Sequence, residues 1–250
     1  GEINQVRRTI GVRINPTGKP QDEFNFRLKY TREWQHMIAS TRLTKKESLN
    51  AYRTVFIPSI SYPLGAIYLS PEKCQHIQSQ ALQAYLPKIG FNRKFPPQVI
   101  YGPPHFGGWG EKKIFNIMAI NQIKLFIGHV RNNDDTGKLL LSELEYVQLI
   151  AGIQHPVLNK STPTNFLKWT PSCWITNFKI ILTHIEGETK IANQWIPSTQ
   201  RKKDTFLMES FFKYTQDTHT LQILNNCRLY LQIPTFSDIT SSDGKKLKKT

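Results

Sequence analysis

Cysteine is scarce in this sequence: the 250 residues contain three, Cys74, Cys173 and Cys227. They are far apart, odd in number and free of Cys-x-x-Cys spacing, so the sequence predicts neither a disulfide framework nor a zinc site. Isolated cysteines of this kind fit a reducing environment. We therefore expect an intracellular protein of the cytoplasm or nucleus.

Long apolar runs are also missing. No stretch approaches the roughly 20 residues that a membrane helix needs, and no signal peptide opens the chain. We therefore expect no membrane partner. Gly1 rather than Met is the first residue, so we also expect the sequence to be a piece of a longer polypeptide.

Acidic residues are few: 18 Asp and Glu stand against 33 Lys and Arg, which gives a formal net charge of +15. The first hundred residues carry most of this excess, with 15 basic residues against 6 acidic ones. A cationic surface beside aromatic rings suits a sugar-phosphate backbone, which binds through counterion release. Ribosomal or merely soluble basic proteins share such a charge, so the charge favours nucleic-acid binding but does not by itself establish it.

Residues that could do chemistry are sparse. Asp134 and Asp135 form an acidic doublet, but they precede a helical pattern, where Asp is typical of a helix cap rather than a two-metal site. The seven histidines form no i, i+4 pair, and no Ser or Cys has a recognisable catalytic partner. Gly107, Gly108 and Gly110 lack the spacing of a phosphate-binding loop, so we expect them to form backbone turns. We expect this chain to have no catalytic residues and no cofactor of its own.

The stretch from Thr41 to Gly108 has the clearest helix signals. Thr44 and Glu47 have the spacing of a capping box, which predicts a helix from Lys45. Pro58 and Pro63 are expected to kink or interrupt it. Ser70 and Pro71 predict the next helix, which packs through Cys74, Ile77, Ala81, Leu82 and Tyr85 and ends near Pro87 and Gly90.

The whole pattern predicts a mainly α fold. A strand or hairpin with a turn occupies residues 1–19, a helical bundle 20–155, a linker 156–169, and a second, smaller α(+β) subdomain with a basic tail 170–250. Within the bundle we expect helices over 20–40, 111–131 and from Asp134 or Asp135 to Ala151, and a short strand at Val99–Tyr101. In the second subdomain we expect helices from Thr170, over 204–214 and over 217–231, and a strand over 191–196.

Two groups of cations are candidates for nucleic-acid contact. One group surrounds the start of the helix at Lys45, and the other flanks Phe91 and Phe95 in a loop rich in Gly and Pro, where rings could stack on a base or sugar. A solvated surface is the plain alternative for each group. The candidate residues are Arg42, Lys45, Lys46, Arg53, Lys88, Arg93 and Lys94.

Several segments resemble one protein family in combination. They are TIGVRINPTG, TRLTKKESLNAYRTVFIPSISYPLG, LPKIGFNRKFPPQVIYGPPHFGGWG, IKLFIGHVRNNDDTGKLL and NNCRLYLQIPTFSDITSSDG. Together they resemble the part of non-LTR retroelement reverse transcriptases, which are RNA-directed DNA polymerases, that follows the catalytic palm. The resemblance covers nearly the whole chain.

This resemblance implies a thumb and C-terminal region. Ile10, Gly11 and Val12 would match the family's strand beside the primer grip, and helices from Pro20 to Leu86 would hold an RNA/DNA template-primer duplex by its backbone. The family's catalytic Asp-Asp motif and its magnesium would belong to an upstream palm, with the fingers, of the same polypeptide; VRNNDDTG does not match that motif. Two alternatives remain open: a basic ribonucleoprotein scaffold without enzymatic activity, and a free-standing enzyme whose acidic site the sequence does not reveal. Substitution of Asp134 and Asp135 would test the second.

Overall fold

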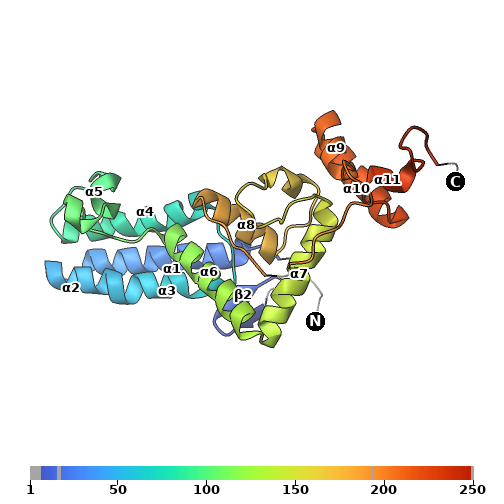
Figure 1. The fold of residues 1–250 in the computed structure, drawn as a ribbon. Helices are drawn as coiled ribbons and strands as arrows, with labels where there is room; N and C mark the ends of the chain where they lie inside the picture. Colours follow the sequence, from blue (N-terminus) through green and yellow to red (C-terminus); the bar gives the residue numbers. More distant parts are fainter. Residues whose placement is uncertain (1–6, 16–17, 193, 249–250) are drawn as a thin grey trace. The chain divides into compact units, whose positions relative to one another are not determined.

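A computed structural model of the chain describes residues 7–15, 18–192 and 194–248. The chain divides into two compact units, Gly1–Leu125 and Phe126–Thr250, and the division falls inside a helix. The fold is mainly helical, with a short two-stranded antiparallel sheet before the helices, which confirms the predicted fold class (Figure 1).

The sheet is a hairpin of β1 (Arg7–Thr9) and β2 (Val12–Ile14), in which Thr9 pairs with Val12. Ile10 and Gly11 form its turn, both with positive φ (48° and 81°), as a two-residue type I′ hairpin turn requires. The prediction of Ile10, Gly11 and Val12 as one strand is therefore wrong for the first two residues, because the chain reverses there. Only Val12 lies in a strand, where it is buried.

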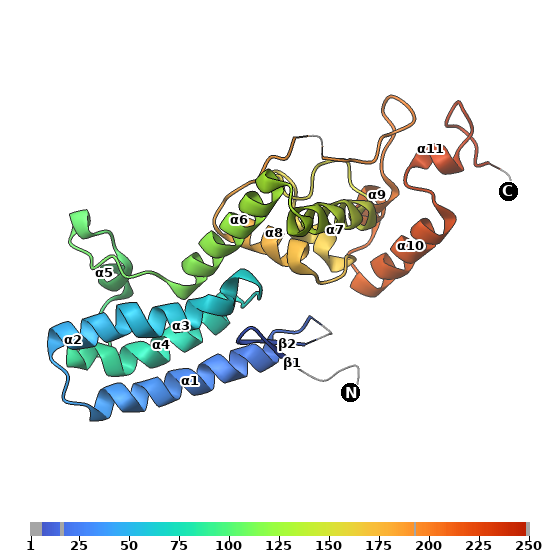
Figure 2. The ribbon, with the colours of Figure 1, turned by 90° about the horizontal axis from the view of Figure 1, so that it is seen from below.

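Helices of unit 1 lie side by side in both views (Figures 1 and 2). They are α1 (Gln21–Ser40), the continuous run of α2 (Lys45–Asn50), a π-helical segment (Ala51–Phe56), α3 (Ile57–Ser61) and a 3-10 turn (Tyr62–Gly65), and α4 (Pro71–Lys88). The run begins at Lys45 and α4 at Pro71, as the capping signals predict.

Pro58 and Pro63 interrupt the helical run as predicted. They do so by changing the pattern of backbone hydrogen bonds rather than by breaking the helix. The Ile57 N–H donates to Tyr52 O, five residues earlier, just before Pro58. A wider π turn relieves the clash between a proline ring and the carbonyl four residues before it. At Pro63 the run tightens to a 3-10 turn and ends.

Several aromatic rings pack on one another in the core of unit 1. Tyr52 stacks on Tyr85 with 4.3 Å between ring centroids, and Trp34 lies 4.7 Å from Phe56. Gln78, also buried, donates to the Tyr52 hydroxyl (3.2 Å) and to a backbone carbonyl just before α6 (Ile114–Asn132). These contacts join the helical run, α4 and α6 into one core.

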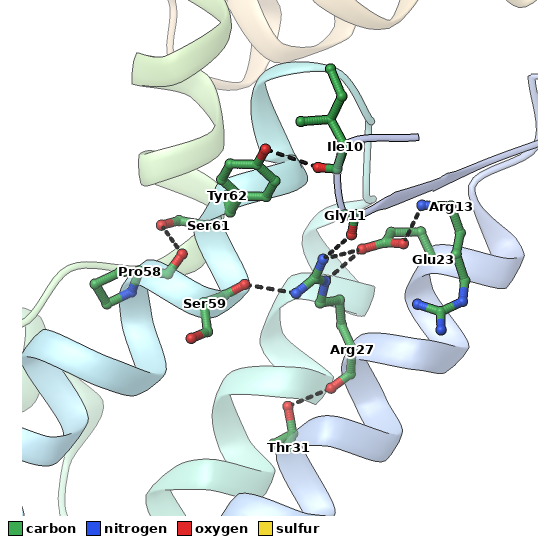
Figure 3. A network of polar contacts seen from close by, with 10 residues as sticks. All are labelled: Ile10, Gly11, Arg13, Glu23, Arg27, Thr31, Pro58, Ser59, Ser61 and Tyr62. Carbon is green, nitrogen blue, oxygen red and sulfur yellow. Dashed lines mark hydrogen bonds and ion pairs between the residues drawn. The ribbon is translucent and has the colours of Figure 1, made fainter. Parts of the chain in front are cut away.

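A polar network fastens the hairpin to the helices (Figure 3). The buried Arg27 side chain of α1 donates to Glu23 Oε1 (2.5 Å) and to Ser59 O of α3 (2.8 Å). Glu23 Oε2 accepts the backbone N–H of Arg13 in β2 (2.7 Å), and the Tyr62 hydroxyl donates to Ile10 O in the turn (2.9 Å). The charged pair therefore orients the hairpin against α1 and α3.

Unit 2 contains α7 (Asp135–Ala151), a 3-10 turn (Thr164–Lys168), α8 (Trp174–His184), α9 (Leu207–Tyr214), α10 (Thr218–Leu231) and α11 (Phe236–Ile239). Its core includes the rings of Phe126, Trp174 and Phe178. Helix α7 ends before Gly152, as predicted, while α8 starts at Trp174, later than the expected Thr170.

Three expectations differ from the structure. Residues 97–101 form a short helix, α5 (Pro97–Tyr101), not a strand, because Pro97 supplies a helix start. The described residues of 191–196 are not in a strand. The division between units lies at 125/126 rather than at 156–169, a segment that packs through buried Val157, Leu158 and Phe166.

Candidate nucleic-acid interface

Three separate segments meet at one end of unit 1: the start of α2, the end of α4 and the loop that contains α5. Figure 1 shows α2 and α5 at that end. They line an open cavity of about 370 Å³. Its lining residues are Lys45, Lys46, Leu49, Arg53, Ile89, Phe91, Trp109 and Glu111.

The α2 side of the cavity is fixed by the capping box. The Glu47 N–H donates to Thr44 Oγ1 (3.3 Å), and the Thr44 N–H donates to Glu47 Oε2 (2.8 Å). Glu47 Oε2 also accepts from the Thr44 hydroxyl (2.7 Å), and the bonds that it accepts from the backbone N–H and the hydroxyl of Thr44 hold the pKa of the Glu47 carboxyl below its usual value. They define the first turn, on which Lys45 and Lys46 are exposed to solvent.

The α4 side is fixed by the way that helix ends. Gly90 has φ +94°, its N–H donates to Pro87 O (3.1 Å), and the Phe91 N–H donates to Leu86 O (2.9 Å). This pair of bonds is the Schellman termination, which needs a left-handed residue after the helix. It directs Phe91 to the cavity, where the Lys45 amine lies close enough to Gly90 that an added Cβ would be 3.0 Å from Nζ.

Backbone hydrogen bonds place Trp109. Its N–H donates to Val99 O of α5 (2.8 Å), and the Glu111 N–H donates to Ile100 O (3.0 Å). Gly108 is required here, since a Cβ on it would collide with the Gly102 backbone. The loop therefore folds back on α5 and presents Trp109 and Glu111 together.

The rings pack on one another beside the cavity. Phe91 meets Trp109 edge to face (4.2 Å), while Phe95 stacks on Trp109 (5.2 Å, 21°). All three are only partly exposed. The cavity thus has an aromatic wall held in place by a third ring, with the amines of α2 at its edge.

The seven predicted cations have different surroundings. Arg53 is paired with the buried Glu111, at 2.7 Å from Nη2 to Oε1, and that carboxylate raises the pKa of Arg53. The Lys88 amine donates to Thr41 O at the end of α1 (2.7 Å). In the described part of the chain the other five form no ion pair and are exposed: Arg42, Lys45, Lys46, Arg93 and Lys94.

The sequence did not predict four residues that line this cavity: Leu49, Ile89, Trp109 and Glu111. Trp109 follows two glycines that the sequence predicts only as turns, and nothing local pairs Glu111 with a residue 58 positions earlier. The position of Trp109 beside glycines in a basic loop was the one local signal that could have predicted it as a candidate binding residue.

A second cationic groove lies where the hairpin meets α1. It has a volume of about 760 Å³ and includes Arg8, Arg13 and Lys29, but also Asp22 and Glu33. The Arg13 guanidinium sits 3.5 Å above the Phe26 ring centroid. Because its charges are mixed, this groove is a weaker candidate for a phosphate backbone than the end of unit 1.

Asp134 caps α7, as predicted. Its Oδ1 accepts the Gly137 N–H (2.8 Å), and its Oδ2 lies 2.7 Å from His129 Nδ1. Asp135 is exposed and lies 3.4 Å from the Lys138 amine. Among the described residues no three His, Cys, Asp or Glu side chains gather as a metal site would require.

No family model, curated protein or solved structure matches this chain. None of the helices in the described residues is both long and apolar enough to cross a bilayer. The geometry of unit 1 and the resemblance noted above are therefore the grounds for a functional assignment.

Proposed function

We propose that unit 1 grips the sugar-phosphate backbone of an RNA/DNA template-primer duplex, in the manner of a reverse-transcriptase thumb. One observation carries the proposal: the segment that bears Arg42, Lys45 and Lys46 lies against the end of α4 and the following loop, which bears Arg93 and Lys94, through the hydrogen bond from Lys88 Nζ to Thr41 O and the cavity that both segments line. A phosphate-binding surface needs exposed cations from distant segments to lie close together. A surface that is merely soluble does not need this.

The chemistry of these side chains fits backbone contact rather than sequence readout. Lysine amines are compact, mobile charges that suit phosphate oxygens, and their stems can adapt to either strand. Arg53 and Lys88 have structural partners in the protein, so they position the cationic surface instead of binding phosphate themselves. Nucleotide addition, with magnesium, is proposed for an upstream palm of the parent polypeptide, for which this chain would hold the duplex.

The test is filter binding of the whole chain to a blunt RNA/DNA hybrid over a series of salt concentrations. Wild-type protein should bind with an affinity that falls steeply with salt. The variant K45Q/K46Q should bind more weakly, and the slope of log K against log salt should decrease in magnitude by about 2, one for each phosphate contact. The variant R93Q/K94Q should behave in the same way.

The matched control is K245Q/K246Q, which removes two exposed lysines from the C-terminal segment. It loses the same charge as K45Q/K46Q but should keep the wild-type slope and nearly the wild-type affinity. Binding that is absent or insensitive to salt would contradict the proposal. If K245Q/K246Q weakened binding as much as K45Q/K46Q does, net charge rather than this surface would determine the affinity.

A further inference from the structure

We infer that the cavity at the end of unit 1 binds one unpaired nucleotide, with the base against the aromatic wall and its phosphate at Lys45 and Lys46. This inference rests on the proposed function, because both use the same two amines. The inference goes beyond the proposed function because it assigns a ligand to the apolar interior of the cavity. Contact with the backbone of a duplex does not use that interior.

The interior of the cavity has the composition of a base site. Leu49 and Ile89 supply apolar surface, and Phe91 and Trp109 supply rings, all from elements whose ends are fixed by backbone hydrogen bonds. A paired base cannot reach such a wall, because both of its faces are stacked in the duplex. An unpaired base can enter and pack on the rings.

The edge of the cavity supplies the complementary charge. Lys45 and Lys46 are exposed at its rim, and Lys45 lies over Gly90, next to Phe91. Glu111 is also part of the lining, but its charge is balanced by the two hydrogen bonds that Oε1 accepts from Arg53. A nucleotide therefore meets an apolar wall and net positive charge within one cavity of about 370 Å³, in the range of small-ligand sites.

The experiment compares two single strands of equal length and charge: oligothymidylate and an oligomer of abasic sugar-phosphate units. Wild-type protein should bind oligothymidylate about 10-fold more tightly, since stacking of a base on an aromatic side chain has an effect of this order. W109A should reduce the ratio towards 1, and W109F should retain part of it. F106A is the matched control, because Phe106 lies in the same loop, is 82% exposed and is not among the cavity residues; its ratio should equal that of the wild type.

The affinity of each variant for the blunt hybrid separates the two proposals. W109A should leave that affinity within about 2-fold of wild type, whereas K45Q/K46Q should weaken both single strands and the hybrid while preserving the base-dependent ratio. Equal binding of both single strands by the wild type overturns the inference even if the hybrid binds well. An unchanged ratio in W109A, or a loss in F106A as large as in W109A, overturns it too.

Discussion

The Arg53 guanidinium donates to a single oxygen of Glu111 through both Nε and Nη2, at 2.8 and 2.7 Å. Arg53 belongs to the π-helical segment after α2, and Glu111 lies in the loop that carries Trp109. The Glu111 side chain is 5% exposed, while that of Arg53 is 46% exposed. The pair thus links two walls of the cavity through one buried carboxylate.

Replacing Arg53 with Gln should destabilise unit 1 by about 1.5 kcal/mol, the lower part of the range for a hydrogen bond to a charged group, because Arg53 is half exposed. The buried Glu111 carboxylate would lose its cation. R53Q/E111Q should recover much of that loss, since no unpaired charge remains. Hydrogen exchange of peptides from α4 and the α5 loop measures the effect; equal losses in R53Q and the double variant would contradict it.

Substitution of Glu23 or Arg27 should destabilise unit 1 more than substitution of Arg53. Both side chains are buried, and their hydrogen bonds reach the hairpin and α3. E23A leaves the Arg27 charge unpaired and should cost about 3 kcal/mol in the opening free energy of α1, measured by hydrogen exchange. The matched control is E33A on the same helix. Glu33 faces Lys29 at 3.9 Å with both side chains exposed, so its loss should stay within about 0.5 kcal/mol.

Rescue distinguishes a charge effect from simple damage to packing. E23A/R27M removes both charges and keeps an apolar stem in place of the guanidinium. It should be less destabilised than E23A alone, because burying an unpaired cation costs more than losing the pair. A double variant that loses as much as the sum of the two single variants would contradict this account.

Local chemistry explains which features the sequence could predict. The starts of α2, α4 and α7 follow from Thr44 with Glu47, from Ser70 with Pro71, and from Asp134, because a cap is made by side chains within three residues of the helix. The candidate cations could also be predicted locally, because they cluster near helix ends and in one loop of the sequence.

Features that depend on distant partners could not be predicted. The pairing of Arg53 with Glu111 requires the α5 loop to fold back, and the packing of residues 156–169 depends on Gln148, which bonds to three backbone groups of the following turn. Polar and proline-containing residues there predicted a linker, although Val157 and Leu158 are fully buried. Helix α5 is different, because Pro97 at its first position is a local signal that predicts a helix start.

Gly152 should tolerate no side chain. It has φ +57°, and an added Cβ would lie 2.8 Å from Arg228 Cζ. The buried Arg228 donates to Leu149 O and Ile150 O at the end of α7, and burial lowers its pKa to about 10. G152A should therefore destabilise unit 2 by at least about 1–2 kcal/mol, the cost of the left-handed conformation alone, measured by hydrogen exchange of α7 and α10.

The same substitution at Gly128 is the control for G152A. Gly128 lies within α6, and apart from the backbone of that helix no atom lies within 4 Å of the point that an added Cβ would occupy. G128A should therefore stabilise the helix by about 0.5–1 kcal/mol. Opposite signs at two glycines of one unit would show that backbone conformation and the approach of Arg228 determine the result. A destabilisation of the same size at both positions would refute that explanation.

The start of α7 should weaken in acid through Asp134. The Gly137 N–H and then His129 hold the pKa of Asp134 below its ordinary value. A carboxyl with a lowered folded-state pKa stabilises the fold fully above its unfolded pKa of about 3.9, and the contribution disappears as pH falls through the folded value. D134N keeps an acceptor oxygen without a titrating charge, so its deficit in stability relative to wild type should be largest at neutral pH and should disappear as the pH falls through the folded-state pKa of Asp134. Hydrogen exchange of peptides from the first turns of α7, compared at equal pH so that intrinsic rates cancel, measures the difference.

D135N, at an exposed side chain, should show no such trend, and a pH-independent deficit in D134N would contradict the role of the carboxylate.

The three cysteines should react in the order of their exposure. Cys227 is exposed on α10, whereas Cys74 is buried in α4, where desolvation raises the pKa of its thiol to about 12. Because the thiolate is the reactive form, a disulfide reagent at pH 8 should label Cys227 rapidly and Cys74 only after unfolding. Cys173, partly buried with a raised pKa, should react at an intermediate rate. Mass spectrometry of labelled peptides gives the three rates; C227S should remove the fast phase, and fast labelling of Cys74 in the folded chain would contradict the packing of α4 in unit 1.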